Sequence, residues 1–439
     1  MNKSTSAAGA PATLKRDIKT LVNASLPRRH AAEFRFRLYG LIAVSLGLAF
    51  VVLMFGNIIA KGYPAFMQTY IQVPIKFDPA VIDPQGARDE KTLQSADYAE
   101  LVRAGLKQLF PNVEGRSQLR ALEALVSSGG AIELQRRVLA TPALIGSEQE
   151  IWLLASAGVD TLVKGNIDRS LDESERPVKD NQIGWVDKLL AAGKIQKQFN
   201  TILFSNGDSR EPEMAGIRGS LMGSFYTLLV TFLLSFPIGI ATAVYLEEFA
   251  PKNRWTDIIE VNINNLAAVP SIVFGLLGLA VYINFFGLPR SAPLVGGLVL
   301  SLMTLPVIII AGRAALTSVP PSIREAALGI GASKLQMVGH HVLPLAMPGI
   351  LTGSIIGMAR ALGESAPLLM IGMIAFIVDV PKNLTDPSTV LPVQIYLWSD
   401  LPERAFVERT SAAIIVLLAF MILMNGMAIL LRKRFERRW

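Results

Sequence analysis

The stretch PPSIREAALGIGASKLQMVGHHVLPLAMPG, residues 320–349, is the most informative part of the chain. Two prolines at its start cannot continue a preceding helix, and the Ser-x-x-Glu spacing of Ser322 and Glu325 predicts a new helix with a capping box. Gly331 is expected to turn the chain after that helix, and Ser333 to cap a second short helix. The sequence therefore predicts a helix–turn–helix segment between two longer helices, with its second helix ending near His341. The apolar residues expected to be exposed on it include Ile323, Leu335, Met337 and Val338.

Long apolar stretches surround this segment. A helix needs about 20 apolar residues to cross the hydrocarbon core of a membrane. Five of the stretches carry no charge, and the remaining one carries only Arg360 and Glu364. The six predicted spans lie within residues 38–60, 219–246, 261–289, 291–312, 342–378 and 410–431.

The distribution of basic residues predicts the orientation. The arm 1–37 and the tail 432–439 are rich in Lys and Arg, which resist translocation, so both are expected in the cytoplasm. Two cytoplasmic ends require an even number of spans, so we interpret 342–378 as one span with a break at Pro367. The net charge of +7 then reflects the basic residues of the segments on the cytoplasmic side, and we predict no nucleic-acid partner. The stretch 38–60 is too long for a signal-peptide core and is interpreted as a retained anchor.

Residues 61–215 separate the first two spans. A connection of this length is too long to lack structure, so we predict an extracytoplasmic domain, mainly helical with some strand. It contains neither His nor Cys, and its carboxylates are spread along helical stretches. We therefore predict no catalytic and no metal site in it.

The segment 320–349 resembles the EAA motif of ABC importer permeases, E-A-A-x₃-G-x₉-I-x-L-P. One position departs from the motif, because His341 stands where the family usually has Ile. In that family the loop docks on the ATPase subunit and transmits its motion. The chain has no G-x-x-x-x-G-K-[ST] motif, so the resemblance implies a non-enzymatic transport subunit whose partner binds ATP and Mg, with no cofactor of its own. The residues in register, implied to couple to the ATPase, are Glu325, Ala326, Ala327, Gly331, Leu343 and Pro344.

Arg360 and Glu364 are the charges predicted within a span. Ionisable groups at this depth are costly and usually face the interior of a helix bundle or a wet cavity. The same span carries Gly349, Gly353 and Gly357, whose spacing permits close helix packing. In a helix, Arg360 and Glu364 would lie on the same face as these glycines. The charged pair is therefore expected to face a helix contact or a substrate pathway. A structural ion pair is the alternative, although the fork of Arg suits a tetrahedral oxyanion.

Three further stretches resemble the phosphate-specific (PstA-like) permeases: residues 207–224, 247–281 and 359–368. The resemblance extends over roughly residues 205–439 and implies transport roles for Arg360 and Glu364. It also implies a second related permease subunit, an ATPase dimer and a periplasmic phosphate-binding protein as partners. A permease for sulfate or molybdate, a membrane-anchored sensor and a proton-coupled carrier remain as alternatives.

The expected fold is an all-α polytopic protein of the bacterial inner membrane, in contact with lipid and with about six transmembrane helices. The expected domains are a cytoplasmic arm 1–37, a helix 38–60, an extracytoplasmic domain 61–215, a permease domain 216–431 with a coupling loop 313–345, and a cytoplasmic tail 432–439.

Overall fold

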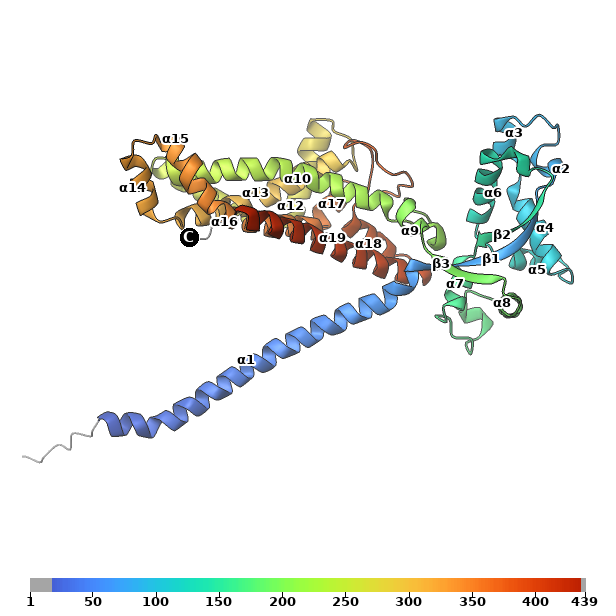
Figure 1. Ribbon diagram of the computed structural model, residues 1–439, viewed down its shortest axis with the longest axis horizontal. Coiled ribbons are helices and arrows are strands. Elements are labelled where there is room, and N and C mark those ends of the chain that lie inside the picture. The colour runs from blue at the N-terminus through green and yellow to red at the C-terminus, as the bar shows by residue number, and fades with distance from the viewer. Residues whose placement is uncertain (1–17, 436–439) are drawn as a thin grey trace, which may run out of the picture. The chain divides into compact units, whose positions relative to one another are not determined.

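The computed structural model describes residues 18–435 (Figure 1). The first 17 residues of the predicted basic arm and the last four of the basic tail lie outside the described residues. Helix α1, Ile18–Gly62, has 45 residues and is therefore about 67 Å long, more than a bilayer core requires. Its apolar part includes the predicted span 38–60.

The remaining membrane-type helices confirm the polytopic, mainly helical fold. Within residues 18–435, five helices, α1 among them, are long and apolar enough to span a membrane, or up to six if one bent pair counts as a span. The elements after the folded domain are α10 (Arg218–Val244) with η5 (Tyr245–Phe249), α11 (Arg254–Ala267), α12 (Ser271–Leu277) with η6 (Gly278–Phe285), α13 (Pro293–Thr317), α14 (Pro321–Gly329), α15 (Lys334–Met337) with η7 (Val338–Val342), α16 (Leu343–Gly363), α17 (Ala366–Met370), α18 (Leu391–Ser399) and α19 (Ala405–Phe435).

The predicted third span, 261–289, is not one straight helix. The chain forms α11 and the α12–η6 helix, which meet at an angle of 103°. Pro270 stands at the break as the N-cap of α12, where its missing N–H and fixed φ interrupt the helix. The apolar run therefore contains a sharp corner that hydropathy alone does not indicate.

The stretch 342–378 contains one long helix, and its break lies slightly before the predicted position. Helix α16 ends at Gly363, and Glu364 adopts an extended conformation with φ −80° and ψ 126°. Pro367 has no N–H to donate to the carbonyl of Gly363, so the helix cannot continue through it. The short helix α17 follows, with Pro367 in its first turn.

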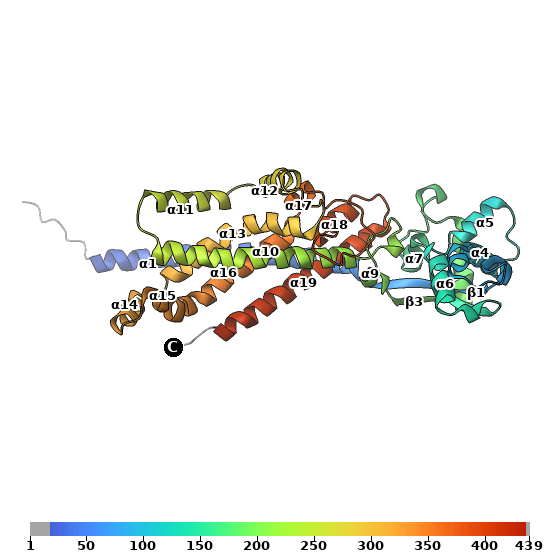
Figure 2. The same ribbon diagram turned by 90° about the horizontal axis from the view of Figure 1, so that it is seen from above.

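Helices α10, α13 and α16 run side by side and form the centre of the bundle (Figure 2). The glycines of α16 face α13 closely. A Cβ atom added at Gly349 would lie 2.7 Å from the Cβ of Ala315, and one added at Gly353 would lie 2.1 Å from the Cβ of Ala311. At Gly357 the nearest atom would be Cγ2 of Thr304, at 3.0 Å. Backbones at this distance leave no room for a side chain.

Gly353→Ala is expected to destabilise the helix bundle, because the added methyl group overlaps Ala311 and forces α13 and α16 apart. Overpacking of this kind costs about 1–3 kcal/mol. Thermal unfolding of the purified protein in detergent measures the effect. Gly426→Ala in α19 is the matched control, because its added Cβ meets no atom within 4 Å. Equal melting temperatures for the two variants would contradict the close packing.

The sheet domain, residues 67–199, contains one antiparallel sheet of order β2–β1–β3 surrounded by short helices. Strand β1 is central and pairs Tyr70 with Leu154 of β2 and Met67 with Phe199 of β3. Alternate apolar side chains of β1, among them Ile71, Val73 and Ile75, are fully buried in a core with the helices. The elements are β1 (Met67–Lys76), α2 (Pro79–Ile82), α3 (Glu90–Ser95), α4 (Tyr98–Leu109), α5 (Arg116–Glu123), α6 (Gly129–Ala140), β2 (Glu148–Leu154), α7 (Ala157–Val163), α8 (Asp180–Ala191) and β3 (Ile195–Phe199).

A buried ionic network connects the sheet domain to α19. Nζ of Lys164 lies 2.6 Å from Oδ2 of Asp160 and 3.1 Å from Oε2 of Glu408, which belongs to α19. Only 5% of the Lys164 side chain is exposed. Nearby, the η4 turn (Pro212–Met214) holds Glu213, whose pKa is raised by burial. The domain is therefore joined to the last helix by charged groups that are largely removed from water.

Lys164→Met should destabilise this junction, because it removes the lysine that pairs with Asp160 and Glu408 and leaves the buried Arg409 as the remaining cation beside them. Removing one partner of a buried ion pair typically costs about 3–5 kcal/mol. Limited proteolysis and thermal unfolding would report the loss. Lys188→Met, at an exposed position of α8, is the control. A melting temperature unchanged by Lys164→Met would show that the network contributes nothing to the junction.

Candidate functional site

The segment predicted as helix–turn–helix forms α14, a turn and α15, here called the hairpin (residues 320–342). Helix α14 begins at Pro321 with Pro320 as its N-cap, and no side chain caps it. The predicted capping box of Ser322 and Glu325 is therefore wrong. The fixed φ of proline favours the first helical position, and this moves the helix start one residue before Ser322.

The turn of the hairpin depends on Gly331. Its φ of +88° is in the left-handed region, which glycine adopts without steric cost. Ser333 then caps α15 through a capping box with Gln336, as predicted. The second helix does not end near His341, however. It passes through the π-helical turn η7 into α16, so Leu343 and Pro344 lie inside one continuous helical run, Lys334–Gly363.

The surface of the hairpin differs in part from the prediction. Met337 and Val338, expected to be exposed, are buried in a cluster with Ala327 and with residues of α10 and α13. Leu335 is exposed as expected. The most exposed apolar side chain is Ile330, at 81%, next to Gly331 at the turn. Glu325 and Ala326 are exposed on α14. The hairpin thus combines a buried base with an apolar, protruding turn.

Arg360 and Glu364 are close to one another at the end of α16. Nε of Arg360 lies 3.6 Å from Oε1 of Glu364, and the two side chains are 50% and 21% exposed. Of the two expected surroundings of the pair, a helix contact is not what Arg360 has, since the glycines face α13 while its guanidinium remains half open. The pair therefore presents a positive group at the surface of this chain.

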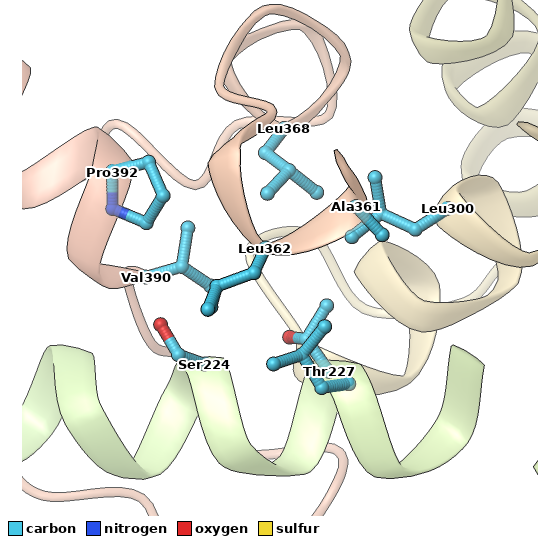
Figure 3. A pocket seen from close by; sticks show the side chains of 9 residues that line it. Ser224, Thr227, Leu300, Ala361, Leu362, Leu368, Val390 and Pro392 are labelled. Carbon is cyan, nitrogen blue, oxygen red and sulfur yellow. The ribbon is translucent and has the colours of Figure 1, made fainter. Parts of the chain in front are cut away.

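A small cavity lies among α10, α13, α16, α17 and α18 (Figure 3). It has about 10 Å³ of space for the centre of a water molecule, which is room for about one water. Ala361 and Leu362 line it, while Arg360 does not. The hydroxyl of Thr227 at its wall is buried without a hydrogen-bond partner in the described residues. The cavity is too small for an oxyanion.

No metal centre is found in residues 18–435. No group of three or more His, Cys, Asp or Glu side chains has the geometry to hold a metal ion there. His340 and His341 are both exposed on η7.

Two families match the chain. A "Domain of unknown function (DUF3333)" matches residues 23–173, and "Binding-protein-dependent transport system inner membrane component" matches residues 235–439. The second match contains the hairpin, α16 and the Arg360–Glu364 pair. The first contains most of the sheet domain and α1.

Known relatives match about half of the chain. The "Probable ABC transporter permease protein YqgI" of Bacillus subtilis is 31% identical over 250 residues, covering 54% of this chain and 84% of the relative. The "Phosphate transport system permease protein PstA 1" of Mycobacterium tuberculosis is 33% identical over 223 residues, covering 51% of this chain and about 71% of the relative. PstA of Haemophilus influenzae is 28% identical over 223 residues, covering 51% and 78%.

Among solved structures, an inward-facing form of the MetNI methionine ABC transporter matches with a TM-score of 0.40 and 20% identity, covering 49% of this chain and 95% of that one. A bacterial ABC transporter involved in alginate import matches with a TM-score of 0.39 and 16% identity, covering 50% and 80%.

Proposed function

Because the chain belongs to the family of binding-protein-dependent transport system inner membrane components, the permease subunits of ABC importers, we propose that its cargo is inorganic phosphate. The observation that carries the proposal is the half-exposed Arg360 with Glu364 beside it at the end of α16. A guanidinium group offers paired donors that match two oxygens of an oxyanion. Several relatives of this chain, at 28–33% identity, are phosphate permeases by name.

Glu364 gives the site a means of release. At 3.6 Å from Nε of Arg360, its carboxylate competes with an incoming anion for the same guanidinium. A transport site must bind its substrate strongly enough to capture it and weakly enough to release it. In the proposed mechanism phosphate displaces Glu364 from part of Arg360, and Glu364 returns when phosphate leaves.

The hairpin is the proposed docking element for an ATPase subunit. Ile330 and Leu335 offer apolar anchors, and Glu325 lies on the exposed side of α14. Anchors of this type, surrounded by polar residues, are typical of interface hot spots. The hairpin then faces the cytoplasm, as does the chain's basic tail, and the sheet domain faces the periplasm.

The open side of Arg360 supports a second permease subunit as partner. The cavity beside α16 holds about one water, so a passage for phosphate would be completed by another subunit against α16. A periplasmic phosphate-binding protein would deliver the cargo at the opposite end, and the partner ATPase would bind ATP and Mg. We propose this chain as one half of the pathway.

Co-purification followed by ATP-driven uptake tests the proposal. The chain is purified with its partner subunits and reconstituted with the binding protein in liposomes that contain ATP. Accumulation of labelled phosphate, unaffected by excess sulfate or molybdate, is expected. Uptake of sulfate or molybdate in place of phosphate would show that the cargo is another oxyanion. Phosphate uptake by the chain alone would show that ATP is not the energy source.

A further inference from the structure

The end of α10 carries a short π-helical segment, Tyr245–Phe249, with the sequence YLEEF. π-helical turns inside α-helices are rare and occur frequently at functional positions. Its two carboxylates, Glu247 and Glu248, lie where the chain leaves the bundle. We call residues 245–249 the α10 terminus, and it contacts the hairpin through two separate interactions.

The first interaction is made by Arg324 of α14. Its Nη2 and Nε donate to Oε1 of Glu248 at 2.7 Å and 3.1 Å. The Glu248 side chain is only 7% exposed, so this ion pair is shielded from water on one side. An arginine held by two donors to one carboxylate has a defined orientation, unlike a mobile surface pair.

The same guanidinium also binds the end of α13. Nη1 donates to the carbonyl of Val319 at 2.6 Å, and Nη2 donates to the carbonyl of Leu316 at 2.9 Å. Carbonyls in and just beyond the last turn of a helix lack partners within that helix, and a cation there interacts favourably with its dipole. Arg324 therefore joins three elements: α14, the end of α13 and the α10 terminus.

The second interaction connects α15 to the same segment. Nζ of Lys334 lies 5.2 Å from the ring centroid of Phe249, within the range of a cation–π contact. Beneath both interactions, Met337 and Val338 of the hairpin pack in one buried cluster with Ala243 of α10. The two helices of the hairpin are thus fixed independently to the α10 terminus.

Two further ion pairs extend the connection to α11 and α13. Nη2 of Arg313, in α13, lies 2.8 Å from Oε1 of Glu260 in α11, and Nε of the same arginine lies 3.5 Å from Oε2 of Glu247. The neighbouring carboxylates Glu247 and Glu248 therefore bind two arginines from different helices.

We infer that Arg324 and Glu248 are positioning residues that make the hairpin and the inner end of α10 move as one body, so that ATPase motion reaches α10 and α13. The inference rests on the proposed function, because it needs an ATPase on the hairpin. Helix α10 begins beside the sheet domain and ends at the hairpin, so it can carry displacement along the bundle (Figure 2). Without the ion pair, the hairpin would still bind the ATPase but would move without α10.

The test compares Arg324→Gln, Glu248→Gln and the double variant in the reconstituted complex. ATPase co-purification is expected to persist, while phosphate transported per ATP hydrolysed falls by about tenfold, as expected for the loss of one coupling interaction. The double variant should be no worse than Arg324→Gln alone, because Arg324→Gln already removes the ion pair with Glu248. Arg254→Gln, an exposed arginine at the start of α11, should leave the ratio unchanged.

A distance measurement separates failure of this inference from failure of the proposed function. The chain has no cysteine, so spin labels can be placed on Leu328 of α14 and Ile238 of α10, both exposed. The distance should stay fixed with and without ATP in the native sequence and broaden in Arg324→Gln. An unchanged phosphate-to-ATP ratio or an unchanged distance distribution in that variant overturns the inference. If the complex with the native sequence transports no phosphate, the proposed function is overturned instead. The distance measurement then decides by itself whether the hairpin and α10 move together.

Discussion

Arg360→Gln is expected to reduce ATP-driven phosphate uptake by about two orders of magnitude, which is the scale of removing one partner of a charge pair that bound phosphate would shield from water. Glutamine keeps polarity and much of the length but loses the charge and the paired donors that an oxyanion needs. The side chain is half exposed, and within the described residues its one ion pair is with Glu364, so folding should be unaffected. Uptake of labelled phosphate is compared with ATPase co-purification in the same preparation.

Two further variants make this result specific. Ile356→Leu changes an exposed apolar side chain one helical turn away and should preserve uptake. Glu364→Gln should also slow uptake, although for a different reason: phosphate would bind Arg360 without a competitor and leave more slowly. Undiminished uptake in Arg360→Gln would remove Arg360 from the pathway and leave the pair as a packing feature.

The membrane helices could be predicted because their signal is local. A run of about 20 apolar residues indicates a span whatever it packs against. The corner at Pro270 could not be predicted, since proline within a membrane helix produces a kink, a break or little change depending on its neighbours. Helix α18, Leu391–Ser399, is too short to give such a signal and was absent from the prediction.

The orientation of Arg360 shows why the site was only partly predictable. Helical angles placed Arg360 and Glu364 in the stripe of glycines, but Glu364 is extended and no longer follows the helix. A long side chain such as Arg can also direct its charged end away from its own Cβ. Similarly, the spacing of Met337 and Val338 does not indicate whether a partner protein or the chain's own α10 covers them, and in the structure it is α10 and α13.

The turn of the hairpin leads to the second large effect. Ile330→Asp is expected to weaken ATPase binding by about thirtyfold or more, because losing one apolar hot spot costs about 2 kcal/mol or more. Ile330 is 81% exposed, so the permease itself loses no internal packing. Placing a carboxylate there adds the cost of burying an unpaired charge in the interface. Co-purification of the ATPase subunit, followed by phosphate-dependent ATP hydrolysis, measures the loss.

Ile330→Val is the matched control, since it keeps an apolar side chain on the same turn and should retain most of the binding. The two variants separate docking from transmission. Ile330→Asp removes the ATPase from the complex, whereas Arg324→Gln leaves it bound and lowers only the phosphate carried per ATP. If Ile330→Asp retained full ATPase binding and uptake, the protruding turn would not be the docking surface. The coupling role of Glu325 and Gly331, which depends on the same surface, would then have to be abandoned.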